Sequence, residues 1–235
     1  MTVVTHRALD GGRLELEADL DLSGPFTSVL DLGLDGRRHE FTAGTADLCD
    51  EVAAAAGVGG FTEELSYAGG MLLIGRAGVA DPRTGLADDL TVATWRGRRY
   101  GLVTSLYNVS TADVLALLNT VRIAEHDDGI AIGRAPGSAS TVPGGALVLK
   151  EVPGLGLLEI TGRTREAVAQ LPSWAGLRVP AGELFRDTLS NGAPYFVLAT
   201  ASAMVTVLPL TSTAVESVPE LLGAVRIAMR TAPRW

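Results

Sequence analysis

The feature that most constrains this chain is a short sequence that occurs twice. Residues 117–124 (LLNTVRIA) return as residues 221–228 (LLGAVRIA), and each copy follows a stretch with the pattern of a β-hairpin. Such self-similarity is typical of an internal duplication, and a repeat decides the architecture before any other feature does. The shared residues are mostly apolar, so the repeat predicts a packed framework and says little about chemistry. The alternative is a chance match of common residues.

We therefore expect two halves built from one folding unit. Residues 135–143 (APGSASTVP) have the small, polar composition of a linker and are bounded by prolines. This places a first α+β repeat at residues 1–134 and a second at residues 144–235. In each half the sequence predicts a mainly antiparallel sheet with a closing amphipathic helix packed on one face.

Hydrophobic periodicity and turn residues predict the individual elements. Asp35 and Gly36 predict a tight hairpin between residues 28–34 and 37–42. Other strands are expected at residues 14–17, 71–79, 90–95, 99–106, 130–133, 144–149, 155–160, 195–200 and 204–208. Helices are expected at residues 45–56, 111–124, 163–171 and 180–189, and from a capping box at 217–220 through the second copy of the repeat.

The composition is that of an acidic globular protein. The chain has 235 residues, 47% of them hydrophobic, and a formal net charge of −8. This is enough apolar material for one or two cores, and the negative charge opposes non-specific binding to nucleic acid or anionic lipid. Lys150 is the only lysine among nineteen basic residues, as in proteins encoded by GC-rich bacterial genomes.

The sequence predicts a cytoplasmic location. Cys49 is the only cysteine, which excludes an internal disulfide and a thiolate metal cluster and fits a reducing compartment. Residues 1–21 carry charges and lack the apolar core of a signal peptide. Residues 188–215 hold no charge and are long enough to span a bilayer. Their prolines and hydroxyl side chains nevertheless favour a buried hairpin.

We predict no catalytic, cofactor-binding or metal site. None of the three histidines, His6, His39 and His126, lies within a predicted helix, where a second ligand four residues away would share its face. Residues 19–24 (DLDLSG) resemble the start of a calcium loop, but Leu30 stands where that loop needs a glutamate. Residues 57–60 follow a predicted helix and do not open one, so they indicate a helix stop and not a phosphate cradle. Cys49 is expected to be a small buried side chain.

The most distinctive predicted surface feature is a hairpin tip rich in arginine. Arginines flanked by aromatic rings are suited to bind an anion or RNA, and an acidic protein partner is favoured at least as much here. The alternative is a solvated turn whose arginines balance nearby acids. The tip expected at the same place in the second half, residues 201–203, is neutral. The candidate partner-binding residues are Trp95, Arg96, Arg98, Arg99 and Tyr100.

Two functions are open at this stage. We favour a non-catalytic cytosolic binding or assembly module: an adaptor, chaperone or scaffold subunit of a bacterial complex. It would act with a protein partner or as a homo-oligomer, without cofactor, membrane or nucleic acid. The second is an enzyme or small-molecule-binding protein with a site in the cleft between the halves. Its candidate residues would be the arginine tip together with Glu63, Glu64, Asp88 and Asp89.

The order of elements around residues 72–121 and 195–225 is strand, turn, strand and capped helix. This order resembles that of the cytosolic chaperones of type VII secretion. The resemblance implies a chaperone that holds helical segments of effectors before export. It rests on no specific motif, so it implies no functional residue in this chain.

Overall fold

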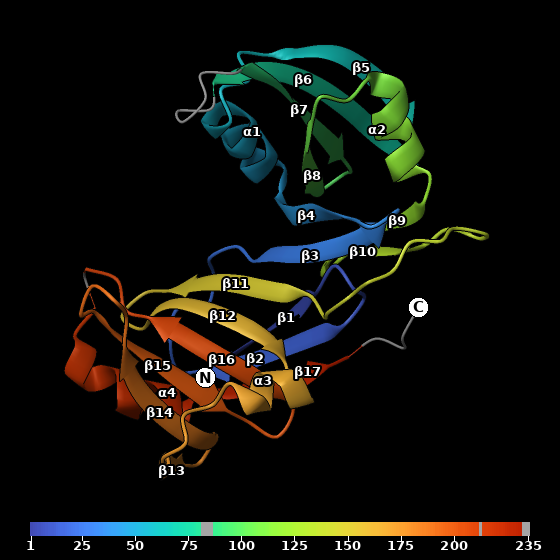
Figure 1. The fold of residues 1–235 in the computed structure, drawn as a ribbon. Helices are drawn as coiled ribbons and strands as arrows, with labels where there is room; N and C mark the ends of the chain where they lie inside the picture. Colours follow the sequence, from blue (N-terminus) through green and yellow to red (C-terminus); the bar gives the residue numbers. More distant parts are fainter. Residues whose placement is uncertain (81–86, 212, 232–235) are drawn as a thin grey trace. The chain divides into compact units, whose positions relative to one another are not determined.

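Antiparallel sheet dominates the fold (Figure 1). The computed structural model describes residues 1–80, 87–211 and 213–231. These residues form seventeen strands, four α-helices and one short 3-10 helix. They divide into two compact units, which we describe separately. Unit 1 comprises Met1–Ala8, Gly12–Thr27 and residues 145–231, and unit 2 comprises Leu9–Gly11 and Ser28–Gly144.

The sheet of unit 2 has the strand order β3-β4-β8-β7-β6-β5. The hairpin predicted at Asp35 and Gly36 is confirmed, because both residues have positive φ, 50° and 75°, as a type I′ turn requires. A second hairpin pairs β9 with β10. The strand bounds are β3 Thr27–Leu34, β4 Arg37–Thr45, β5 Phe61–Tyr67, β6 Gly70–Ala80, β7 Ala87–Arg96, β8 Tyr100–Tyr107, β9 Val121–His126 and β10 Gly129–Arg134.

Two helices pack on this sheet. Helix α1 (Ala46–Ala55) buries Cys49 and Ala53 against a cluster that includes Val92 and Val103, and the helix stop predicted at Gly57 is confirmed by its φ of 81°. Helix α2 (Thr111–Leu118) begins at a capping box in which Ser110 and Asp113 bond each other's backbone N–H. Its buried residues are Val114, Leu117 and Leu118.

The sheet of unit 1 has the strand order β11-β12-β16-β15-β14-β13. Three further strands pair in the order β17-β2-β1. The bounds are β11 Leu147–Val152, β12 Gly156–Gly162, β13 Leu177–Val179, β14 Gly182–Thr188, β15 Pro194–Ala199, β16 Ala203–Leu208, β1 Thr2–Arg7, β2 Arg13–Ala18 and β17 Arg226–Arg230.

The helices of unit 1 are shorter. Helix α3 (Arg165–Ala169) has no buried residue of its own, although Ala167 and the following Leu171 pack against a small cluster of Phe185, Ala199 and Met204. Helix α4 (Val218–Ala224) follows the 3-10 helix η1 (Val215–Ser217) and buries Val218, Leu222 and Gly223. Unit 1 therefore covers its sheet with less helix than unit 2.

Both predicted closing helices were too long. The helix predicted at residues 111–124 ends at Leu118, and Val121–His126 is a strand that pairs with β10. The last helix ends at Ala224, and Arg226–Arg230 pairs with β2. The β-branched residues Val121 and Ile123 favour a strand once a partner strand is available. The expected capping box at Ser217 is also wrong, since its hydroxyl donates to the Ala214 carbonyl.

The helix predicted at residues 180–189 is wrong as well. Gly182–Thr188 forms strand β14, which pairs on both sides with β13 and β15. The helix predicted at residues 163–171 is confirmed only as the short α3. Residues 195–200 and 204–208, from the uncharged stretch, form most of β15 and β16. No helix among the described residues is long and apolar enough to cross a bilayer.

The segment predicted as a linker is held by hydrogen bonds within unit 2. Gly33 and Thr141 exchange two backbone hydrogen bonds of 2.8 and 2.9 Å. The Ala135 N–H donates to the Thr120 carbonyl at 2.9 Å, and the Ser140 hydroxyl donates to the same carbonyl at 3.3 Å. Strands β1 and β2 belong to the unit that contains residues 145–231.

Candidate functional site

The side chains of Trp95 and Arg96, at the end of β7, are engaged in contacts within unit 2. Trp95 is 3% exposed, and its indole N–H donates to the Tyr67 carbonyl at 2.8 Å, so its one polar group is satisfied. The Arg96 guanidinium pairs with Asp50 of α1 and lies 5.6 Å from the centre of the Phe61 ring. These two predicted contact residues therefore hold neighbouring elements together.

The turn that follows is organised around the carboxylate of Glu125, which comes from β9. This carboxylate accepts the backbone N–H groups of Arg98 at 2.8 Å, Arg99 at 2.7 Å and Tyr100 at 3.1 Å. Burial opposes ionisation of Glu125, but these three hydrogen bonds and the nearby charge of Arg98 lower its pKa below the ordinary value. Glu125 thus fills a nest of N–H groups that would otherwise suit an anion.

The two outer arginines remain largely exposed. Arg98 is paired with Glu125 at 3.6 Å and Arg99 with Asp127 at 3.3 Å, yet their side chains are 81% and 63% exposed. The Tyr100 hydroxyl donates to the Asp127 carbonyl at 3.1 Å. The structure therefore brings all five predicted residues to one hairpin end. Only Arg98 and Arg99 present most of their surface to solvent.

The corresponding turn of unit 1 is held differently. The Thr200 N–H donates to the Ala203 carbonyl at 2.9 Å, as the Gly97 N–H does to the Tyr100 carbonyl at 2.9 Å. The Thr200 hydroxyl accepts the Ala203 N–H at 2.9 Å and the Ser202 N–H at 3.3 Å. Gly97 has no side chain for this task. Glu125 therefore performs in unit 2 what Thr200 performs in unit 1.

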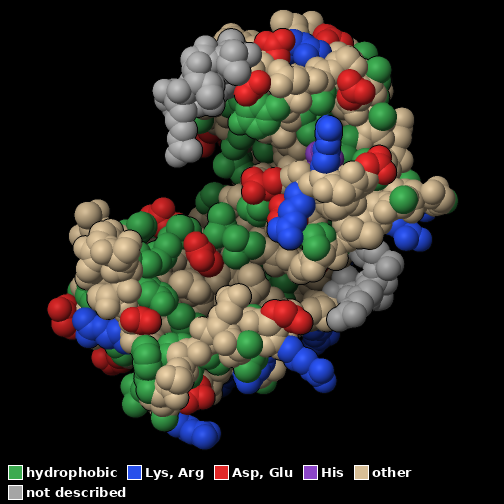
Figure 2. Space-filling model, in the orientation of Figure 1, with side chains coloured by type: hydrophobic (Ala, Val, Ile, Leu, Met, Phe, Trp, Pro, Cys, Tyr) green, Lys and Arg blue, Asp and Glu red, His purple; other side chains and the backbone are tan. Residues whose placement is uncertain are grey.

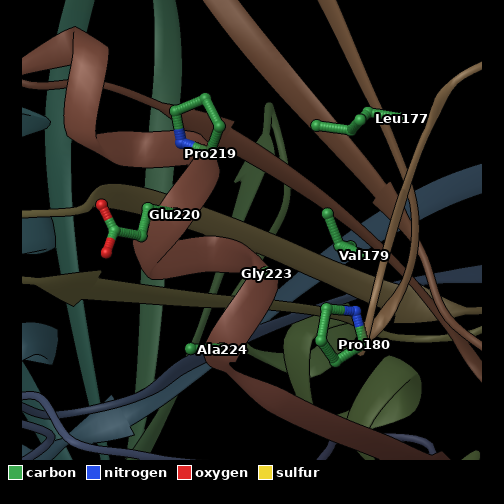
Figure 3. A pocket seen from close by; sticks show the side chains of 7 residues that line it. All are labelled: Leu177, Val179, Pro180, Pro219, Glu220, Gly223 and Ala224. Atoms are coloured by element: carbon green, nitrogen blue, oxygen red, sulfur yellow. The ribbon is translucent and has the colours of Figure 1, made fainter.

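An open apolar hollow lies between β13 and α4 in unit 1 (Figure 3). Its volume is about 320 Å³. Its two walls are in contact at Gly223, where a Cβ would stand 3.3 Å from the Val179 side chain. The hollow was not expected from the sequence, because residues 180–189 were predicted to be a helix. Its lining residues are Leu177, Val179, Pro180, Pro219, Glu220, Gly223 and Ala224.

Large exposed apolar side chains gather in the same unit. Leu177, on the wall of the hollow, is 62% exposed, and Trp174, three residues before it, is 52% exposed. Hydrophobic side chains are visible at the surface of this unit in Figure 2. Of the nine such side chains in the described chain, two, Met71 and Tyr107, belong to unit 2, and the others are Met1, Val3, Val168, Trp174, Leu177, Leu189 and Leu210.

Other groups considered from the sequence are engaged in structure. Cys49 is buried, as predicted, and burial raises the pKa of its thiol to about 12. In the stretch that resembles a calcium loop, Asp21 accepts the N–H and hydroxyl of Ser23 at 2.9 and 2.6 Å. The Gly24 carbonyl accepts a hydrogen bond from Lys150. No cluster of three or more potential metal ligands is present in residues 1–80, 87–211 and 213–231.

Comparisons with protein-family models, with curated proteins and with solved structures gave no match.

Proposed function

We propose that this protein is a non-catalytic binding or assembly module, an adaptor, chaperone or scaffold subunit, and that unit 1 carries its docking surface. The observation that carries the proposal is the open hollow, with Leu177 exposed on its wall and Trp174 exposed three residues earlier in the chain. Apolar surface left open in this way marks a place where a partner binds.

The proposal includes a duplication, in which units 1 and 2 are copies of one framework. If β3 is matched with β11 and the later strands follow, the two strand orders agree. Gly70 and Gly182, which open β6 and β14, then correspond. A Cβ at either glycine would collide with a carbonyl, that of Arg96 or that of Ala199, and these two residues also correspond.

The repeated octapeptide gives further support. It matches Asn119 with Gly223, and the hairpin turns match Tyr67 with Val179. Within each unit, the residue at the hairpin turn contacts the residue of the octapeptide. The Tyr67 hydroxyl lies 3.1 Å from the Asn119 side-chain oxygen, and Gly223 packs on Val179. In unit 2 this contact joins the edge strand to the helix, whereas in unit 1 smaller residues leave the hollow.

The arginine tip belongs to the same proposal as a secondary contact. Arg98 and Arg99 keep their guanidinium groups exposed although both have acidic partners. Exposed arginines of this kind change association rates and salt dependence more than affinity. We assign them to an acidic patch on a protein partner.

The test is capture of partners by the purified full chain from an extract of the organism that encodes it, quantified by mass spectrometry. The variants are Leu177→Asp at the hollow and, as a matched control, Tyr107→Asp, because Tyr107 is similarly exposed, 59%, but lies in unit 2. We expect the same proteins with wild type and Tyr107→Asp, and their loss with Leu177→Asp. Equal capture by all three chains would contradict the proposal.

A further inference from the structure

Strand β13 offers an open sheet edge beside the hollow. It is the last strand in its sheet order, and in the described chain it pairs only with β14. Leu177 and Val179 line the hollow, and side chains alternate along a strand, so Arg178 lies on the opposite face. A free edge next to a side-chain pocket is the arrangement by which extended peptides add to sheets.

The matching contact in unit 2 indicates which kind of side chain would fill the hollow. There the tyrosine ring of Tyr67 extends from the edge strand to Asn119 on the helix. In unit 1 the matching residues are Val179 and Gly223, which carry less side chain, and about 320 Å³ stays open. An aromatic side chain from a partner protein would fill in unit 1 the place that the Tyr67 ring fills in unit 2.

The charge at the hollow indicates the sign of the partner. Glu220 is the one charged residue of its lining, it is exposed, and it has no ion pair within the described part of the chain. A cation next to the aromatic side chain would therefore be complementary to it. The net charge of −8 also attracts basic segments over a longer range.

We propose that the hollow between β13 and α4 receives an aromatic side chain from an extended, basic segment of a partner protein, which lies along β13 and places an arginine or lysine against Glu220. This inference rests on the proposed function and names the chemistry of the partner. The apolar pocket supplies affinity, and the carboxylate supplies selection by charge.

The probe is a fluorescein-labelled synthetic peptide with a tyrosine between two arginines in a frame of valine and threonine, and binding to the full chain is followed by anisotropy. Glu220→Arg, an exposed change, is expected to weaken binding at least tenfold. Val179→Tyr, which introduces the residue of unit 2, is expected to do the same by filling the hollow. Tyr107→Ser is the control variant, and a peptide with serine for tyrosine is the control probe.

The outcomes separate this inference from the proposed function. The inference is overturned if the peptide does not bind wild type. It is also overturned if Glu220→Arg and Val179→Tyr bind the peptide as tightly as wild type does, even if Leu177→Asp still abolishes partner capture. In that case the module remains and only its ligand chemistry is wrong. A wild-type dimer in sedimentation that Val179→Tyr dissociates also overturns it, because the occupant is then a second copy of the chain.

Discussion

Units 1 and 2 place six sheet strands each in the same order but cover these strands differently. Helix α1 of unit 2 is ten residues long and buries two of them, whereas α3 of unit 1 has five residues and buries none. Helix α2 begins with a full capping box, and α4 has no side-chain cap. The edge strand β5 has seven residues and β13 has three. If the two units are copies of one framework, as we propose, the comparison teaches that such a framework can be closed or left open by changes at its margins.

The two units also differ in charge and in exposed apolar surface. Residues 9–11 and 28–144 hold sixteen acidic side chains and nine arginines, whereas residues 1–8, 12–27 and 145–232 hold eleven acidic and nine basic ones. The acidity of the chain therefore belongs mainly to unit 2, and most exposed apolar side chains belong to unit 1. Under our proposals the field of the whole protein attracts a basic partner and the hollow of unit 1 holds it.

One core position differs in kind between the units. The pairing of β4 with β8 and of β12 with β16 matches Thr42 with Glu159. The first hairpins pair these two residues with Val29 and Leu149, so the next residues, Leu30 and Lys150, correspond, and both side chains are buried. The Lys150 ammonium donates to the Gly24 carbonyl and lies 4.3 Å from the centre of the Phe26 ring. Burial lowers the pKa of Lys150, and the charge of Asp21 partly offsets this. The only lysine of the chain thus occupies a place where the other unit has leucine.

The largest expected effect tests whether the framework is shared. Leu118 and Leu222 match in the repeat and are 2% and 0% exposed. Leu118→Ala and Leu222→Ala should each lower the free energy of unfolding by about 2–5 kcal/mol, because each leaves a cavity in a packed core. Urea denaturation measures this, with Leu177→Ala as an exposed control. A small effect at one leucine alone would break the correspondence between the units.

Removal of the Glu125 carboxylate should have the next largest effect. Glu125→Ala leaves three turn N–H groups without their acceptor and should cost about 1–3 kcal/mol in urea denaturation. The exposed Asp127→Ala is the control. Because the folded pKa of Glu125 is lowered, its contribution is present at neutral pH and disappears as pH falls through that pKa. A difference between wild type and variant that persists undiminished in acid would contradict this role.

Lys150→Leu introduces leucine, which stands at the matching position of unit 2, and should change the free energy of unfolding by less than about 1 kcal/mol. Loss of the bond to Gly24 is offset because a buried charge no longer has to be desolvated. The folded pKa of Lys150 is lowered, so wild type should gain stability relative to the variant as pH rises from that pKa toward about 10.4. Denaturation at neutral and alkaline pH tests both statements. A pH-independent difference would show that Lys150 titrates as in the unfolded chain.

The smallest expected effect concerns the arginine tip. Arg98→Ala and Arg99→Ala should each change stability by less than about 0.5 kcal/mol, since both ion pairs are exposed. If the tip contacts an acidic patch on the partner, the double variant should instead slow association with the captured partner at low salt. Surface plasmon resonance at two ionic strengths measures this. Unchanged association rates would leave the hollow as the only contact among those proposed.

Several elements were predicted from local signals alone. The Asp35–Gly36 hairpin and the stop of α1 at Gly57 follow from positive φ, which few residue types adopt, and the structure has both. Capping of α2 by Ser110 and Asp113 was likewise readable from residue type and spacing. The arginine tip was placed correctly on a hairpin between β7 and β8. Its acidic partner Glu125 was not predicted, because residues 111–124 were expected to be a helix and Glu125 was not expected to lie in a strand.

The sequence by itself determined the repeated octapeptide, the antiparallel hairpins and the turns, because these depend on neighbouring residues. Only the tertiary structure decided that the second octapeptide changes from helix to strand at its middle, since Arg226 pairs with β2, a strand distant in sequence. In the first octapeptide the partner of Val121 is the neighbouring strand β10, with which it forms a hairpin. The tertiary structure also decided that residues 182–188 form a strand, because β14 has a partner on either side. Short apolar segments suit either conformation, and the hydrogen-bond partner that folding brings alongside selects one of them. The hollow depends on the tertiary structure as well, because its two walls, β13 and α4, are distant in sequence.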